Sequence, residues 1–189
     1  MFPTLLQVLA VKKDLGCSLI NVCIKWPNDT YYGSEAKLGG VIVKSSVTGD
    51  KFVINIGNAI NLDNLSPTTC LNKLIRDHNE KSDTSDKIAE VAQEHLLAAT
   101  LNQLEKLMAD VEEGRLDEVK QLYYQHWLHG GQVVTVTTRE GEEPVEVEVV
   151  GIDDYGYLVA RKQEDGETVT LHPDGNSFDM MKGLVMPKR

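Results

Sequence analysis

The sequence predicts an α/β domain with a mixed sheet over residues 1–129, followed by a small β-barrel domain over residues 130–189. Before Gly130, short buried strand patterns alternate with segments of helical periodicity. After Gly131, apolar residues follow a period of two in short segments separated by turn residues. The length of 189 residues also suits one full domain and a smaller one.

The first domain combines helices and strands in a regular order along the chain. Gly16 is a suitable helix C-cap, and Pro27 ends a strand because proline cannot donate a ladder hydrogen bond. Polar residues predict a surface loop over 78–86. Ser85, near the end of this loop, is available as the N-cap of the helix that follows. The expected elements are a helix over 4–15, a strand over 20–26, a hairpin with strands over 39–44 and 52–56, a short helix beginning near 66–69, and helices over 88–108 and 116–127.

The second domain is expected to be all β. Turn signals separate its strands, at Glu140-Gly141, at 153–156 and at Asp165-Gly166. Several short strands at such spacing favour a small barrel. The expected strands cover residues 133–137, 145–150, 157–159 and 169–171.

Composition excludes several classes of function. The net charge of −10 argues against a general binder of nucleic acid or anionic membranes, since both need a positive field. The three cysteines form no CxxC pair, and the five histidines are scattered, so no zinc site is predicted. Without a membrane-length apolar run or a signal peptide pattern, the sequence predicts a soluble intracellular protein.

A first polar cluster, Lys25-Trp26-Pro27-Asn28-Asp29, follows a buried strand. A lysine, an amide and a carboxylate at a strand end could bind phosphate and a metal-bridged nucleotide. The alternative is a simple strand-to-turn junction, in which Asn28 and Asp29 bond their own backbone. Taken alone, the cluster favours the junction.

Two further clusters combine glycine with polar residues. Lys37 precedes Gly39 and Gly40, which would allow a ligand to approach the backbone closely while the lysine neutralises an anion. In Gly57-Asn58-Ala59-Ile60-Asn61, glycine again permits close approach, and Asn61 could coordinate a metal or a phosphate. The alternatives are an exposed lysine beside a loop and a plain turn.

The order and spacing of the three clusters resemble the biotin protein ligases. The family pattern is K-W-P-N-D, then K-[LI]-[AG]-G-[IV] within a dozen residues, then a turn similar to I-G-x-G-x-N. The likeness is greatest to the animal enzymes called holocarboxylase synthetases. It covers nearly the whole chain, because segments over 61–64, 67–72 and 172–180 also resemble theirs.

The resemblance implies a ligase that uses ATP and biotin, with Mg²⁺. Biotin's carboxylate attacks the α-phosphorus of ATP to give biotinyl-5′-AMP and pyrophosphate, and a lysine of a biotin carboxyl carrier domain then attacks the mixed anhydride. The implied fold is a catalytic domain similar to class II synthetases and lipoate ligases, followed by an SH3-like barrel. The implied partners are the carrier domains of biotin-dependent carboxylases, with a homodimer as an option and a cytoplasmic or mitochondrial location.

The resemblance also assigns site residues. Lys37 and Asp29 would be catalytic: Lys37 would contact biotin's carboxylate and the reacting phosphoryl oxygens, and Asp29 could accept a proton from the carrier lysine. The remaining assignments are biotin binding by Lys37, Gly39, Gly40, Val41 and Gly57, nucleotide binding by Lys25, Trp26, Asn28 and Asn61, and metal binding by Asp29 and Asn61.

Two departures from the family pattern leave alternatives open. Ala59 stands where the family usually has a second glycine, which could narrow the site unless the local φ is negative. The upstream Gly-Arg-rich loop of the family is not found, so the chain is expected to begin inside the catalytic domain. The alternative functions are a non-catalytic relative that binds carrier domains and a lipoate-type ligase.

Overall fold

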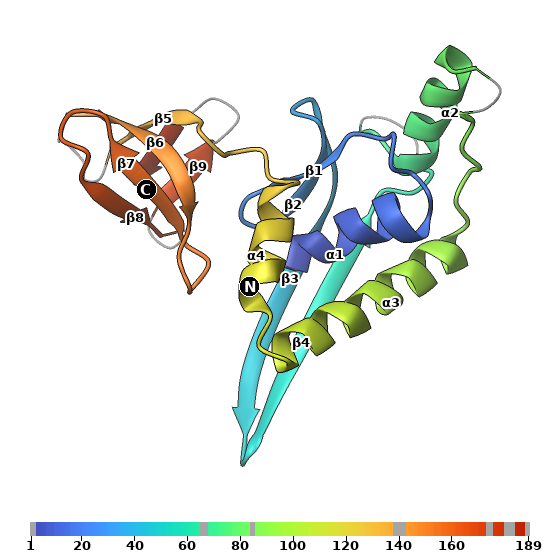
Figure 1. Ribbon diagram of the computed structural model, residues 1–189, viewed down its shortest axis with the longest axis horizontal. Coiled ribbons are helices and arrows are strands. Elements are labelled where there is room, and N and C mark those ends of the chain that lie inside the picture. Colours follow the sequence, from blue (N-terminus) through green and yellow to red (C-terminus); the bar gives the residue numbers. More distant parts are fainter. Residues whose placement is uncertain are drawn as a thin grey trace. The chain divides into compact units, whose positions relative to one another are not determined.

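The computed structural model describes residues 3–64, 68–83, 86–137 and 143–172, and the backbone of 176–179 and 184–187 (Figure 1). The chain divides into two compact units, Phe2–Leu128 and His129–Arg189. Each unit has its own sheet. The predicted N-cap Ser85, the turn at Glu140-Gly141 and residues Pro173–Gly175 of the tail segment lie outside the described residues.

The sheet of the first unit is an antiparallel meander in the order β1-β2-β3-β4. The expectation of a mixed sheet in this unit is wrong for these strands, because short turns can join only antiparallel neighbours. Parallel pairing among the described residues of this unit is limited to one isolated bridge, between Ile24 and Trp127. The strands are β1 (Val22–Lys25), β2 (Asp29–Tyr32), β3 (Ala36–Thr48) and β4 (Lys51–Ile60).

The predicted hairpin is confirmed, and it is longer than expected. Strands β3 and β4 pair continuously from Gly39–Ile60 to Thr48–Lys51, around a turn in which Gly49 has a φ of 65°. The sequence 57–61, expected to be a turn, instead continues β4 up to Ile60. Apolar side chains of the hairpin, such as Phe52 at 66% exposure, are open to solvent within this unit.

The first helix confirms the expectation for the N-terminal segment. Helix α1 (Pro3–Leu9) continues as a π-helical stretch, η1 (Ala10–Asp14), and Gly16 follows with a φ of 68°. Nearly all side chains of α1 are buried, and the helix packs on β1, β2 and β3. Helix α1 therefore supplies the core beneath the sheet.

The later helices differ from the expectation at their ends. Helix α2 (Leu71–Lys81) includes residues 78–81, which were expected in a loop, because their polar side chains cover its solvent face. Helix α3 (Gln93–Glu112) begins later than expected, since Ala92 has extended backbone and the chain before it is not helical. Helix α4 (Leu116–Tyr124) begins where it was predicted and ends three residues before the expected end at Trp127. Among the described residues, no helix is both long and apolar enough to cross a bilayer.

The second unit contains a six-stranded sheet in the order β8-β7-β6-β5-β10-β9. Its pairings are antiparallel except for the parallel pair of β10 and β5. No pairing between β8 and β9 closes this sheet among the described residues, so the predicted closed barrel is not observed. The strands are β5 (Val133–Val136), β6 (Val145–Ile152), β7 (Leu158–Lys162), β8 (Thr168–Leu171), β9 (Asn176–Asp179) and β10 (Leu184–Pro187).

Candidate active site

Three charged side chains meet where β1, β2 and β3 lie side by side. The Nζ atom of Lys37 lies 2.6 Å from Oδ1 of Asp29, and Nζ of Lys25 lies 3.9 Å from its Oδ2. Lys25 also sits over the ring of Tyr31, 5.3 Å from the centroid. Two ammonium groups thus share one carboxylate, which leaves a local excess of positive charge suited to an anion.

The strand register produces this cluster. Lys25 pairs with Asp29 across β1 and β2, and Lys37 pairs with Tyr31 across β2 and β3. The register of β2 against β3 shifts between Thr30 and Tyr31. The sequence prediction that these three charged residues serve one site is consistent with this geometry, although their roles stay predictions.

The two glycines of the second cluster are required by protein contacts. A Cβ on Gly39 would lie 2.4 Å from the carbonyl oxygen of Ala59, and a Cβ on Gly40 would lie 3.1 Å from Oδ1 of Asp29. Gly40 is therefore in contact with the charged cluster. Ala59 has no positive φ, so its methyl group adds no backbone strain.

Other residues assigned to the site are already engaged by the protein. The backbone N–H of Val41 donates to the carbonyl of Asn28 over 2.8 Å, and the side chain of Val41 is buried. Trp26 is only 3% exposed, so its ring contributes to the core behind the cluster. Val41 and Trp26 would shape a ligand site from behind, whereas Asn28 is exposed.

Gly57 lies away from the charged cluster. It pairs with Ile42, five residues beyond Lys37 on β3, which corresponds to roughly 16 Å along a strand. Asn61 lies closer, because its N–H donates to the carbonyl of Leu38 over 2.8 Å. The structure therefore does not bring Gly57 together with Lys37. It does place the backbone of Asn61 next to Leu38, the residue after Lys37.

Asn61 connects the end of β4 to the start of α2. Its Nδ2 donates to Oγ1 of Thr68 and to the carbonyl of Thr69, each over 3.2 Å, and its own carbonyl accepts from the N–H of Leu71. These bonds fix the chain that follows the third sequence cluster.

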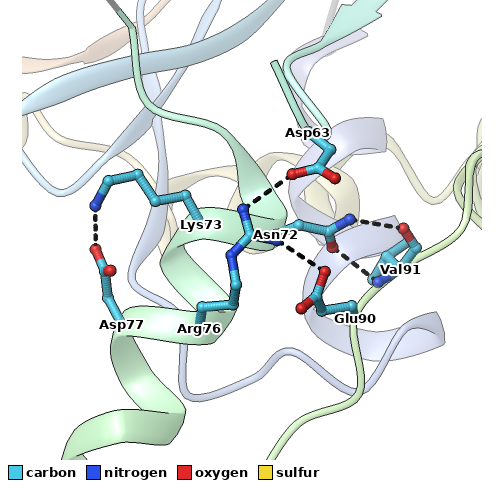
Figure 2. A network of polar contacts seen from close by, with 7 residues as sticks. All are labelled: Asp63, Asn72, Lys73, Arg76, Asp77, Glu90 and Val91. Carbon is cyan, nitrogen blue, oxygen red and sulfur yellow. Dashed lines mark hydrogen bonds and ion pairs between the residues drawn. The ribbon is translucent and has the colours of Figure 1, made fainter. Parts of the chain in front are cut away.

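A second set of contacts holds α2 to its surroundings (Figure 2). The side chain of Asn72 exchanges two hydrogen bonds with the backbone of Val91, of 2.8 Å and 3.0 Å. Arg76 contacts Asp63 at 2.9 Å and Glu90 at 2.8 Å. The loop after Asn61 is thereby tied to the chain that leads into α3.

The described residues do not form a resident metal site. They contain no group of three or more His, Cys, Asp or Glu side chains able to hold a metal ion. The carboxylate of Asp29 is held by two lysines, and the amide of Asn61 is held by Thr68 and Thr69. Metal binding by Asp29 and Asn61 stays a prediction.

Sequence reasoning missed Gln7, Thr30 and Asn58. Gln7 of α1 is completely buried, and its amide contacts Thr30 on β2 and Asn58 on β4. A single glutamine inside an apolar helix was the available signal. Asn58 also lines a cavity of about 540 Å³, together with Ala59, Ile60, Leu62, Asp63, Asn64, Gln93, Leu96, Leu97 and Thr100.

Comparison with known proteins adds the family. The family described as "Biotin protein ligase C terminal domain" matches residues 129–183. The human biotin–protein ligase is 42% identical over 170 residues, which cover 90% of this chain and 23% of the human protein. The chain thus matches the C-terminal domain of the biotin protein ligases over residues 129–183 and is similar to proteins of that name over most of its length.

Other relatives in this family are consistent with the match. Biotin–protein ligase 2 of Arabidopsis thaliana is 37% identical over 189 residues, covering 97% of this chain and 55% of that protein. The chain thus spans between about a quarter and about half of the length of these two relatives.

Solved structures of the family share the fold. The biotin protein ligase of Aquifex aeolicus, solved with biotin and ATP, superposes with a TM-score of 0.56 at 20% identity, covering 90% of this chain and 70% of that one. A biotin protein ligase-like protein of unknown function from Silicibacter superposes with the same score at 14% identity, covering 89% and 70%.

Proposed function

We propose that this chain activates biotin with ATP and transfers it to a lysine of a biotin carboxyl carrier domain. The cluster of Lys25, Asp29 and Lys37 is the observation that carries the proposal. Adenylation joins a carboxylate to a triphosphate, so the reaction needs cations between two anionic reactants. Two lysines that share one carboxylate meet that need, because together they leave a net positive charge for the reactants.

Lys37 would be the mobile member of the cluster. Its side chain is 50% exposed, and an ion pair at such a position contributes about 1 kcal/mol or less. Lys37 can therefore leave Asp29 at little cost to contact biotin's carboxylate and the α-phosphoryl oxygens. The carboxylate oxygen would then attack phosphorus as the bond to pyrophosphate breaks.

Lys25 would hold Asp29 in place during this exchange of partners. The side chains of Lys25 and Asp29 are exposed by 16% and 26%, so both are more buried than that of Lys37. When Lys37 moves to the substrate, Asp29 keeps Lys25 as its partner and retains a free oxygen. That oxygen would accept the proton of the carrier lysine as its nitrogen attacks the carbonyl carbon of the mixed anhydride, the amide forms and AMP leaves.

Mg²⁺, when bound, would offset the charge of the polyphosphate. We place it with the nucleotide, with Asp29 and Asn61 as the protein groups nearest to it. The other family assignments belong to the same proposal: Gly39, Gly40, Val41 and Gly57 for biotin, and Lys25, Trp26, Asn28 and Asn61 for the nucleotide. The second unit would complete an SH3-like barrel.

The partners would be the carrier domains of biotin-dependent carboxylases. An intracellular location is supported by Cys17, Cys23 and Cys70, which are all free thiols. A homodimer is supported by the exposed apolar side chains of the β3–β4 hairpin.

The test is biotin-dependent exchange of labelled pyrophosphate into ATP by the purified chain. We expect exchange in the presence of Mg²⁺, with a loss of roughly 10²-fold or more in Lys37→Ala. Lys44→Ala is the matched control, because Lys44 lies on the same strand and is exposed, and it should retain full activity. Exchange that needs lipoate in place of biotin, or none with either acid, would contradict the proposal.

A further inference from the structure

Gln7 is a fully buried polar side chain in an otherwise apolar helix. Its exposure is 0%, and its neighbours along α1 are mostly leucine and valine. A buried amide must be satisfied by hydrogen bonds or it destabilises the fold. The partners that satisfy Gln7 are therefore informative about its role.

The amide of Gln7 connects three strands of the sheet. Its Nε2 donates to the carbonyls of Ala59 over 2.9 Å and of Gly40 over 3.2 Å, and to Oδ1 of Asn58. Its Oε1 accepts from the hydroxyl of Thr30, which is also completely buried. One side chain thus joins β2, β3 and β4.

Two of these partners, Gly40 and Ala59, share one row of the sheet. Gly40 pairs with Asp29 on one side and with Ala59 on the other. Gly40 is also the residue whose added Cβ would meet the carboxylate of Asp29. Gln7 is therefore bonded to the backbone of the same residue against which the Asp29 carboxylate rests.

Gln7 also fixes the orientation of Asn58, which lines the 540 Å³ cavity. Because Nε2 of Gln7 donates to Oδ1 of Asn58, the carbonyl side of that amide faces α1. The Nδ2 group of Asn58, which has two donors, is then turned away from Gln7. If the amide of Asn58 were flipped, its Nδ2 group would face Nε2 of Gln7, and both groups are donors.

Burial alone does not explain these contacts. Thr4 lies one turn earlier on the same helix and is also 0% exposed, yet its hydroxyl has no hydrogen-bond partner among the described residues. The helix therefore tolerates a buried polar atom without connecting it to the sheet. The four contacts of Gln7 are specific to its place beneath Gly40 and Ala59.

We propose that Gln7 is a positioning residue, which sets the Gly40–Ala59 row and the Asn58 amide and thereby holds Asp29 and Lys37 in their reactive arrangement. The inference rests on the proposed ligase function for its catalytic consequence. It does not rest on that function for its structural consequence, which is the rigidity of the row.

The experiment compares three substitutions in the full chain. Gln7→Met keeps the volume and removes every hydrogen bond, Thr30→Val removes the donor to Oε1, and Thr30→Ser restores it. Thr4→Val is the matched control, because it alters an equally buried polar residue of the same helix that has no partner. Thermal unfolding curves of the variants are measured first, and the kinetics are then compared at a temperature at which every variant is folded.

The first readout is the kinetics of biotin-dependent pyrophosphate exchange. We expect Gln7→Met to lower kcat by roughly 10- to 100-fold with a change of about twofold or less in KM for ATP, since misplaced groups mainly affect the reaction step. Thr30→Val should lower kcat in the same direction, whereas Thr30→Ser and Thr4→Val should stay near wild type. Equal kcat values for Gln7→Met and Thr4→Val would overturn the inference.

The second readout is deuterium uptake over 36–44 and 54–61, which needs no enzymatic activity. Faster uptake confined to these segments in Gln7→Met, and absent in Thr4→Val, is the expected result. Uptake that is unchanged, or raised equally along the chain, would contradict the positioning role.

If wild type shows no pyrophosphate exchange activity, the ligase proposal fails, while deuterium uptake still decides the role of Gln7. If Gln7→Met does not fold, Thr30→Val and Thr30→Ser decide it.

Discussion

The ammonium group of Lys37 lies 2.6 Å from Oδ1 of Asp29, although the two residues belong to different strands. Lys25, from a third strand, approaches the other oxygen of the same carboxylate at 3.9 Å. Asp29 thus stands between two cations that differ in exposure, and each cation can be tested separately from the carboxylate.

Asp29→Asn keeps the shape of the side chain and removes its charge. We expect transfer of biotin to a carrier lysine to fall by roughly 10²-fold or more, because Asp29 is the proposed proton acceptor in that step. Adenylation should fall less, since Lys25 and Lys37 remain. Single-turnover assays of the two steps separate these effects. Asp50→Asn, in the exposed hairpin turn, serves as control, and an equal loss in both steps would refute the assigned role.

Gly40→Ala should damage the site through a steric contact. The new Cβ would lie 3.0 Å from the carbonyl oxygen of Asn28 and 3.1 Å from Oδ1 of Asp29, so these groups must shift from the positions in which Asp29 contacts Lys37. We expect a loss of exchange activity and a destabilisation of about 1 to 3 kcal/mol. Gly130→Ala is the control, since its Cβ would have no other heavy atom within 4 Å and the residue has no positive φ. Equal exchange activities of the two variants would contradict the predicted steric effect at Gly40.

Asn72→Ala should destabilise the first unit. Asn72 is 5% exposed, and its loss leaves the buried N–H and carbonyl of Val91 without the partners that Figure 2 shows. We expect the free energy of unfolding, measured with urea, to fall by about 2 to 4 kcal/mol, because each buried polar group left without a hydrogen bond is costly. Arg76→Ala, which removes two exposed ion pairs beside it, should cost less. The reverse order would show that the ion pairs dominate.

Cys17 should make stability depend on alkaline pH. Burial raises the pKa of its thiol from 9.0 to about 11. The unfolded thiol then ionises at a lower pH than the folded one, so folding stability falls as pH rises from 9 to about 11. The full effect is roughly 3 kcal/mol. Cys17→Ala should flatten the pH dependence of unfolding in this window, whereas an unchanged slope would exclude Cys17 as its source.

The sequence predicted the helices and the hairpin well because their apolar periodicity is strong. Strand β2 was not predicted, although Thr30, Tyr31 and Tyr32 favour a strand, because Pro27-Asn28-Asp29 just before them is typical of a turn. The segment 57–61 was predicted as a turn because glycine commonly ends strands, whereas pairing with β3 keeps it extended. Register and pairing are tertiary properties that local composition does not specify.

The candidate site was predicted in part. Lys25, Asp29 and Lys37 do meet, as the order of the sequence clusters indicated, while Gly57 lies on β4, opposite Ile42 and away from the cluster. Gln7 could not be assigned a partner from sequence, because its contacts lie on strands far along the chain. The exposure of Phe52 could not be predicted from the sequence either, since an apolar strand pattern does not show whether another element covers the strand.

The charged cluster is built from a short stretch of chain, because Lys25, Asp29 and Lys37 come from consecutive strands joined by tight turns. Closing short loops loses little chain entropy, and contacts between near neighbours form early in folding. The residues proposed for chemistry can therefore come together before contacts between distant parts of the chain form. Gln7, which joins this meander from outside it, would then act late, as the contact that locks an already assembled arrangement.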